Sequence, residues 1–249
     1  MRHDKTLEQL WNEAPASTAS FDANAVDRLP EAARRYIRHA FSPGAPLSEC
    51  VRLHMTGSIK LDPGWCAFEA EQVIAWQRGF VWSARAKVNG LPVTGFDRLV
   101  DGEGAMRWKL LGLFNVMSAD GPQLARAAAG RLHAEAIWLP SVLLRPEVTW
   151  TDIDDRRTRA TIDAHGEPSE LELEIDDSGA LRSCSLARWG DLNSGTFAYH
   201  PFGGTADGER TFGGITIPCR NRVGWSFGTP QFERDGEFFR CTIDHAEFR

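Results

Sequence analysis

The sequence predicts an α+β protein that is mostly β: a strongly curved antiparallel sheet of about ten strands, wrapped as a half-barrel or calyx around one long helix. Alternating apolar and polar residues recur in short segments along most of the 249 residues, and this period of two is typical of half-buried strands. One segment of helical period interrupts them. Because a sheet of this size tends to curl, the helix on its concave side is expected to leave an apolar cavity.

The N-terminal part of the chain, residues 1–28, is expected to form a short helical extension and a linker. Residues Leu7 to Trp11 have the pattern of a short amphipathic helix, and an Ala/Pro/Ser-rich stretch follows them. A second helix is expected from Leu29 to Ala40, since a proline and an acid stand in its first turn. Residues 29–249 are predicted to form a single domain, because no later boundary is visible.

From Val51 onward the period changes from helical to two. The pair Asn89-Gly90 is the strongest hairpin signal in the chain. The Gly- and aromatic-rich residues 193–214 are expected to form a long irregular loop. Strands are predicted for residues 51–61, 65–76, 80–88, 91–100, 106–114, 148–153, 158–164, 170–175, 181–189, 215–225 and 238–248.

The helix expected from Gly121 to Leu139 carries the most informative residues. At roughly 100° per residue, Glu135 lies inside its apolar stripe, Arg131 borders the stripe, Trp138 flanks the same side and His133 points away. A carboxylate on an apolar face is costly unless it is paired or hydrogen-bonded. One interpretation is a structural Arg131–Glu135 pair that ties helix to sheet. The other is a carboxylate in a dry cavity that acts as a general acid/base or ligand anchor.

Three polar residues on the predicted strands are further candidates. Arg85 and Asp97 stand in otherwise apolar strands on either side of the Asn-Gly turn, so they either pair across the hairpin or bind a polar group of a ligand. His54 lies on the polar face of its strand and either faces solvent or contacts the ligand. Trp82 would shape the pocket, although tryptophans also simply fill wide β-cores.

Signatures of common enzyme classes are incomplete. Residues 224–228 read Gly-Trp-Ser-Phe-Gly, but the serine lies in a strand pattern rather than at a strand-to-helix turn. His133-Ala134-Glu135 lacks the paired cysteines of the zinc deaminases. Glycine loops for nucleotides and the spaced histidines of zinc proteases are absent from the sequence. We therefore expect neither a metal nor another cofactor.

The composition argues against several partners. A net charge of −6 is unlike that of proteins that bind nucleic acids. The five cysteines have no C-x-x-C spacing, which is typical of free thiols in a reducing compartment. No signal peptide and no apolar window long enough to span a bilayer is visible. We expect a cytoplasmic protein without stable membrane association; the sequence predicts no oligomeric state.

Short motifs follow one another in a fixed order along the chain. They are Leu29-Pro30 with Arg35-Tyr36, Phe80-Val81-Trp82 with Ala84-Arg85, Gly90-Leu91-Pro92-Val93 with Asp97, Leu110-Leu111-Gly112, Glu135 with Trp138-Leu139-Pro140, Trp150 with Ile153-Asp154-Asp155, and Ile217-Pro218 with Trp225. In these motifs the chain resembles the DUF6544 (DUF6920) family of uncharacterised bacterial proteins, over roughly Leu29 to Phe248.

The resemblance implies a half-barrel like that of lipoprotein carriers, in which a curved sheet wraps a helix around an apolar cavity. The present sequence departs from the pattern of this family in two ways. Relatives carry membrane-spanning segments before this domain, whereas the present sequence shows none. An arginine commonly precedes the family's aspartate, whereas Phe96 precedes Asp97 here.

Two functions are consistent with these residues. In the first, slightly favoured because no membrane segment indicates a destination for cargo, the protein is a cofactor-independent cyclase, isomerase or hydrolase that acts on a hydrophobic small molecule. In the second, the cavity only binds or carries an apolar ligand such as a fatty acyl chain. The candidate catalytic residues are Glu135, Arg131 and Asp97, and the candidate ligand-binding residues are Arg85, Trp82, Trp138 and His54.

Overall fold

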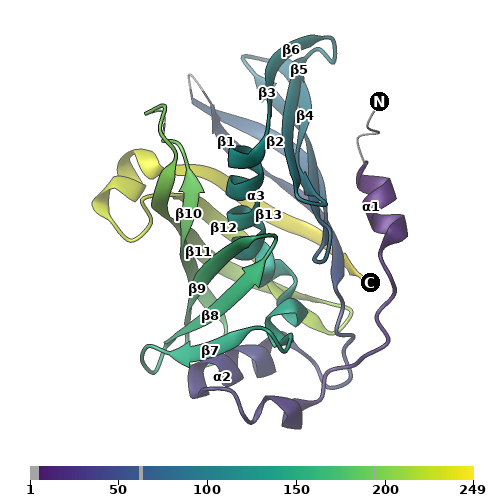
Figure 1. Cartoon of the computed structure of the whole chain (residues 1–249), viewed down its shortest axis with the longest axis vertical. Helices are drawn as coiled ribbons and strands as arrows, with labels where there is room; N and C mark the ends of the chain where they lie inside the picture. The colour runs from purple at the N-terminus through teal and green to yellow at the C-terminus, as the bar shows by residue number, and fades with distance from the viewer. Residues whose placement is uncertain (1–5, 62–63, 193) are drawn as a thin grey trace.

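One antiparallel sheet contains all thirteen strands of the computed structural model, which describes residues 6–61, 64–192 and 194–249. The strand order is β6-β5-β4-β3-β2-β1-β13-β12-β11-β10-β9-β8-β7. Figure 1 shows the sheet folded into two wings, with helix α3 (Pro122–Ala134) between them. The strands are β1 (Cys50–Leu61), β2 (Gly64–Ala75), β3 (Gly79–Val88), β4 (Leu91–Val100), β5 (Glu103–Leu110), β6 (Phe114–Asp120), β7 (Thr149–Asp152), β8 (Arg157–Ala164), β9 (Glu167–Ile175), β10 (Leu181–Gly190), β11 (Ala198–Phe212), β12 (Ile215–Trp225) and β13 (Glu237–Phe248).

The chain builds this sheet in two meanders that meet at its centre. Strands β1 to β6 follow one another outward to one edge, and strands β7 to β13 return from the other edge until β13 pairs with β1. Because neighbouring strands are antiparallel, the β3–β4 and β5–β6 turns lie at the same end of the sheet (Figure 1). We call this the hairpin end.

The predicted class, mostly β with a curved antiparallel sheet, is confirmed, but the expected strand count was too low. The residues taken for a long loop contain β11. Its glycines are required by close strand approach: a Cβ at Gly203 would lie 2.3 Å from the carbonyl oxygen of Cys184, and one at Gly204 would lie 2.1 Å from that of Arg222. The glycines that suggested a loop therefore allow β11 to pair with β10 on one side and β12 on the other.

A second difference concerns residues 106–114, which were predicted as one strand. The structure divides them between β5 and β6, because Leu111 (φ 55°) and Gly112 (φ 71°) adopt left-handed backbone conformations and form a tight turn. Strand β6 then pairs with β5 alone and forms one edge of the sheet.

The long helix is shorter than its periodicity suggested. Helix α3 ends at Ala134, and two short 3-10 helices follow, η2 (Glu135–Trp138) and η3 (Pro140–Leu144). Pro140 restricts the residue before it to extended conformations, which opposes continuation of the helix through Leu139. A single helical wheel therefore does not describe the positions after Ala134.

Two N-terminal helices form where helices were expected, and both pack on the sheet. Helix α1 (Leu7–Glu13) has a capping box at Thr6 and packs its apolar residues on the outer face of β2 and β3. Helix α2 (Glu31–Ala40) buries Tyr36 and Ile37 in the main core, and a 3-10 helix, η1 (Ala23–Val26), precedes it.

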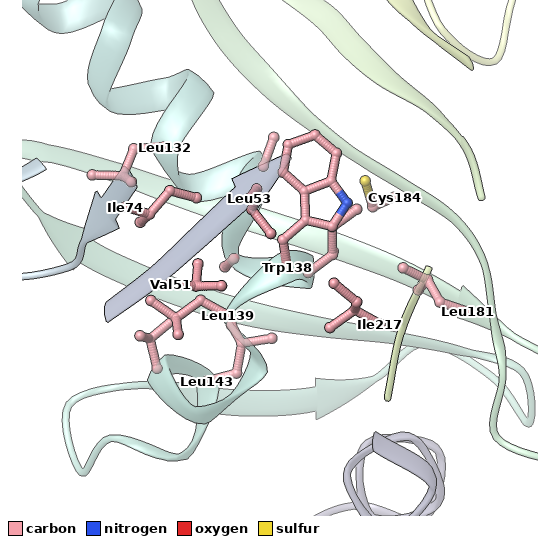
Figure 2. Packing of buried hydrophobic residues seen from close by; sticks show 14 of the residues in the cluster. Val51, Leu53, Ile74, Leu132, Trp138, Leu139, Leu143, Leu181, Cys184 and Ile217 are labelled. Atoms are coloured by element: carbon pink, nitrogen blue, oxygen red, sulfur yellow. The ribbon is translucent and has the colours of Figure 1, made fainter. Parts of the chain in front are cut away.

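The main core lies between the wings, around the end of α3. Figure 2 shows Trp138 and Leu139 among side chains of the central strands, including Leu53 of β1 and Ile217 of β12. Leu53, Leu139 and Ile217 are at most 1% exposed. Because Trp138 also lines the cavity described below, this core forms one wall of that cavity.

Candidate functional site

A cavity of about 700 Å³ lies between α3 and the concave face of the sheet. Its volume falls within the range of small-molecule sites, about 300 to 1,000 Å³. Small side chains create the space: Ala84 and Ala86 on β3, Ala206 on β11 and Ala134 on α3 all line it. The alternation of Ala84 and Ala86 places both on the same face, where larger residues would fill the volume.

The wall of the cavity is mostly apolar and rich in aromatic rings. Trp82 lies 5.6 Å from Trp108 and 5.7 Å from Phe68 between ring centroids. On the opposite wing Phe202 lies 5.0 Å from Trp225. The predicted positions of Trp82 and Trp138 on the cavity wall agree with this structure.

Three of the candidate residues form one charged cluster at the cavity wall. The Nε atom of Arg131 donates to Glu135 Oε1 at 2.7 Å, and an Arg131 terminal nitrogen lies 3.3 Å from Asp97 Oδ2. Their side chains are only 18% (Arg131), 10% (Glu135) and 21% (Asp97) exposed. The predicted Arg131–Glu135 pair therefore forms, and it reaches strand β4 through Asp97.

Further donors complete this cluster. Trp108 Nε1 donates to Asp97 Oδ1 at 3.0 Å, and Gln72 Nε2 donates to Glu135 Oε2 at 2.5 Å. Every oxygen of the two carboxylates thus accepts a hydrogen bond. Burial raises the pKa of Asp97, although Arg131 and the Trp108 hydrogen bond act in the opposite direction.

A second arginine, Arg188 on β10, also faces the cavity. Its Nε atom donates to the Ala127 carbonyl oxygen at 3.0 Å, and its guanidinium lies 4.5 Å from the Phe202 ring centroid and 5.0 Å from that of Trp225. Arg188 forms no ion pair with any residue that the structure describes. Burial, together with the charge of Arg131, lowers the pKa of Arg188 to about 9.

The sequence interpretation missed Arg188, although a signal for it was present. Cys184, Leu186 and Arg188 alternate along one strand, and the first two are buried. The period of two therefore places the arginine on the concave face.

Arg85 and His54 do not lie in the cavity. Both are exposed and line an open groove on the other face of the sheet, beside Glu69 and Glu71. The expected Arg85–Asp97 pair is wrong: the residue opposite Arg85 is Thr94, whereas Asp97 lies opposite Trp82.

That correction follows from the two-residue period of a strand. Asp97 lies on the concave face with its cross-strand neighbour Trp82, and Arg85, three residues after Trp82, lies on the other face. The two charges are therefore separated by the thickness of the sheet.

His133 points away from the cavity, as predicted, and it is buried. Its Nδ1 atom lies 2.7 Å from the Ser169 hydroxyl on β9. Burial, reinforced by the nearby His165, lowers the pKa of His133 to about 4. His133 thus ties α3 to β9 as a neutral side chain.

The family model described as "Family of unknown function (DUF6544)" matches residues 19–234. The chain belongs to DUF6544. No curated protein matches the DUF6544 chain. Within the described residues, no three His, Cys, Asp or Glu side chains converge as ligands of a metal ion, and no described helix is long and apolar enough to cross a membrane. The five cysteines of the DUF6544 chain are buried and unpaired.

Solved structures with a similar course of the chain come from three bacteria. A putative outer membrane lipoprotein-sorting protein domain from Vibrio parahaemolyticus has a TM-score of 0.43 at 7% identity, covering 88% of the DUF6544 chain and 91% of its own. A DUF1329 family protein from Desulfovibrio piger has a TM-score of 0.42 at 11% identity, and the match covers 81% of the DUF6544 chain and 86% of its own. A LolA superfamily protein from Nitrosomonas europaea has a TM-score of 0.41 at 9% identity, and the match covers 95% of the DUF6544 chain and 94% of its own.

Proposed function

We propose that this protein binds and carries an apolar or amphipathic small molecule in the cavity between α3 and the sheet. The observation that carries this proposal is the cavity itself: about 700 Å³, lined mostly by aromatic and aliphatic side chains, in the interior of a well-packed fold. Protein interiors are normally close-packed. A void of this size, bounded by small residues on the strands, is best explained by an occupant.

The state of the charged cluster favours binding over catalysis. A general base needs a lone pair within reach of the substrate proton. Each oxygen of Glu135 and of Asp97 already accepts one hydrogen bond, which leaves at most one lone pair on each oxygen for a substrate. Arg131 is held between the two carboxylates. We infer that these residues fix α3 against β2 and β4 and so keep the two walls of the cavity apart.

Burial of an apolar chain supplies the expected driving force. Each methylene removed from water contributes about 0.8 kcal/mol, so a chain of roughly ten methylenes contributes about 8 kcal/mol before the entropic cost of binding is subtracted. Since that cost is at least about 4 kcal/mol, the apolar chain alone gives a Kd no lower than about 1 mM, and contacts with the aromatic wall and the head group must supply the rest of a carrier's affinity.

A substitution that fills the cavity tests this proposal. Ala84→Trp places an indole in the space, whereas Ser83→Trp, one residue earlier, places the same group on the exposed outer face. We expect the neutral fluorescent probe Nile red to bind wild-type protein and Ser83→Trp alike and to bind Ala84→Trp at least tenfold more weakly. Equal binding by Ala84→Trp would place the probe elsewhere and contradict the proposal.

A further inference from the structure

The cavity contains an arginine that forms no ion pair within the described residues. Arg131 has Glu135 and Asp97 as ion-pair partners, whereas the hydrogen-bond acceptor of Arg188 in the described part of the chain is a backbone carbonyl, at its Nε atom. Its guanidinium contacts the aromatic rings of both Phe202 and Trp225, which also contact each other. Its terminal nitrogens therefore remain as hydrogen-bond donors on a wall that is otherwise apolar.

A buried cation without a partner carries a desolvation cost unless something compensates it. The pKa of Arg188 is lowered by burial and by the charge of Arg131, and the burial effect is this same desolvation cost. Both rings attract the guanidinium by cation–π contact, and the edge that carries its two terminal nitrogens donates no hydrogen bond to a residue that the structure describes. Carboxylate and phosphate groups match this edge with two parallel hydrogen bonds.

We propose that Arg188 binds the acidic head group of a single-chain amphiphile whose apolar chain fills the rest of the cavity. This inference rests on the proposed function and adds the chemistry of the ligand's head. The carboxylates nearby do not oppose it strongly, since Arg131 lies between them and pairs with both. Arg188 is then the residue that selects an acid over a neutral molecule of equal length.

Three ligands of the same chain length separate the head group from the tail: dodecanoate, dodecanol and dodecylamine. Titration calorimetry of the whole chain, with dodecanoate and dodecylamine below their micelle concentrations and dodecanol below its solubility limit, measures their affinities. We expect dodecanoate to bind about tenfold to hundredfold more tightly than dodecanol, as a charge-assisted hydrogen bond requires. Dodecylamine should bind most weakly.

Arg188→Leu is expected to lose this preference while binding dodecanol within a few-fold of wild type, so the alcohol reports whether the cavity is intact. If wild-type protein binds neither acid nor alcohol, the proposed function fails as well. If it binds both equally, or if Arg188→Leu keeps the preference, only the head-group inference is overturned. If Arg188→Leu does not fold, the preference for dodecanoate over dodecanol is compared between Arg188→Gln and the wild-type protein instead.

A different observation carries a second inference, at the hairpin end of the sheet. Six large apolar side chains are exposed at or beside the β3–β4 and β5–β6 turns, and three of them, Leu91, Val116 and Met117, also line the cavity. We call this set the apolar rim. Its members are Leu91, Leu111, Leu113, Phe114, Val116 and Met117, with exposed fractions between 47% and 75%.

The apolar rim is accompanied by positive charge. Lys60, Lys87 and Lys109 are each the penultimate residue of a strand, β1, β3 and β5, and all three are exposed at the same end. Only one other lysine occurs in the chain, which carries a net charge of −6. Asp62 lies outside the described residues.

Exposed apolar side chains beside lysines are suited to an anionic lipid surface, where apolar groups enter the interface and lysines contact the phosphates. The geometry points to reversible docking of the apolar rim on such a membrane, which places the cavity next to the lipid. Membrane-surface lysines contribute roughly a fivefold change in affinity each.

Co-sedimentation with vesicles tests this docking. We expect the protein to bind vesicles that contain phosphatidylglycerol, to release at high salt, and to bind phosphatidylcholine vesicles weakly. Phe114→Ser and Lys87→Gln should each reduce binding, whereas Ile153→Ser, an exposed apolar residue away from the rim, should not. Equal binding to both vesicles, or a Phe114→Ser variant that binds like wild type, would overturn the inference.

A second copy of this chain is the competing partner for the apolar rim, since an unprotected edge strand such as β6 can pair with the same strand of another copy. A dimer in size-exclusion chromatography that Phe114→Ser converts to a monomer, without any vesicle binding, would assign the rim to a second copy instead. Nile red binding by Phe114→Ser checks that the cavity itself is unchanged.

Discussion

Replacing Arg131 by methionine is expected to destabilise the fold strongly. Methionine retains much of the apolar length of the side chain but removes the cation from between Glu135 and Asp97. Both carboxylates then remain at the cavity wall, 10% and 21% exposed, with one hydrogen bond each, from Gln72 and Trp108. The cost is that of leaving buried charge without its partner.

Breaking a buried ion pair from one side typically costs about 3 to 5 kcal/mol. We expect the lower end, about 3 kcal/mol, because Asp97 is partly accessible and both carboxylates keep a neutral donor. For a chain of this length that corresponds to a fall in Tm of about 6 to 12 °C.

The effect should depend on pH in a defined direction. In the folded state the pKa of Asp97 lies above its ordinary value of 3.8, and loss of Arg131 raises it further. The folded state then holds a proton that the unfolded state has released, so stability falls as pH rises above that value. The deficit of Arg131→Met should therefore be larger at pH 8 than at pH 5.

Urea unfolding followed by tryptophan fluorescence measures this difference. Arg156→Met is the matched control, because Arg156 pairs with Asp177 at the surface, where the two side chains are 60% and 82% exposed, and it should change the free energy of unfolding by at most about 1 kcal/mol. If Arg131→Met were no more destabilising than Arg156→Met, the cluster would not hold α3 to the sheet and this reasoning would be refuted.

The buried His133 and the glycines of β11 give two further expectations. The pKa of His133 is lowered from 6.5 to about 4. Its contribution to the free energy of unfolding is therefore fully present above pH 6.5 and declines as the pH falls toward 4, by up to about 3 kcal/mol. In urea unfolding, His133→Asn should reduce this dependence of stability on pH, and His54→Asn should leave it unchanged. Gly203→Ala should cost about 1 to 3 kcal/mol or more because its Cβ meets the backbone of β10, whereas Gly64→Ala, with open space around it, should stay within about 0.5 kcal/mol in the same assay.

Local patterns were sufficient to predict the curved sheet, since alternation along each strand and the turn signals between strands are short-range properties. They failed where a residue's conformation depends on distant neighbours. Gly203 and Gly204 resemble loop residues until β10 and β12 lie beside them. The division between β5 and β6 depends on a left-handed conformation at Leu111, a residue type that rarely adopts it.

The candidate site was predicted in part, for similar reasons. The Arg131–Glu135 pair lies within one helix and follows from its four-residue spacing. The link to Asp97 and the isolation of Arg188 depend on which strands meet across the cavity. No periodicity within a single segment contains that information.

The most direct test of the central claim is a crystal structure of the protein with ω-bromododecanoate, measured at the bromine absorption edge. The account predicts one anomalous peak inside the cavity, beside the rings of Trp82 and Trp108 or beside the apolar rim, with the carboxylate at Arg188. A bromine peak in the outer groove beside His54 and Arg85, with an empty cavity, would contradict it.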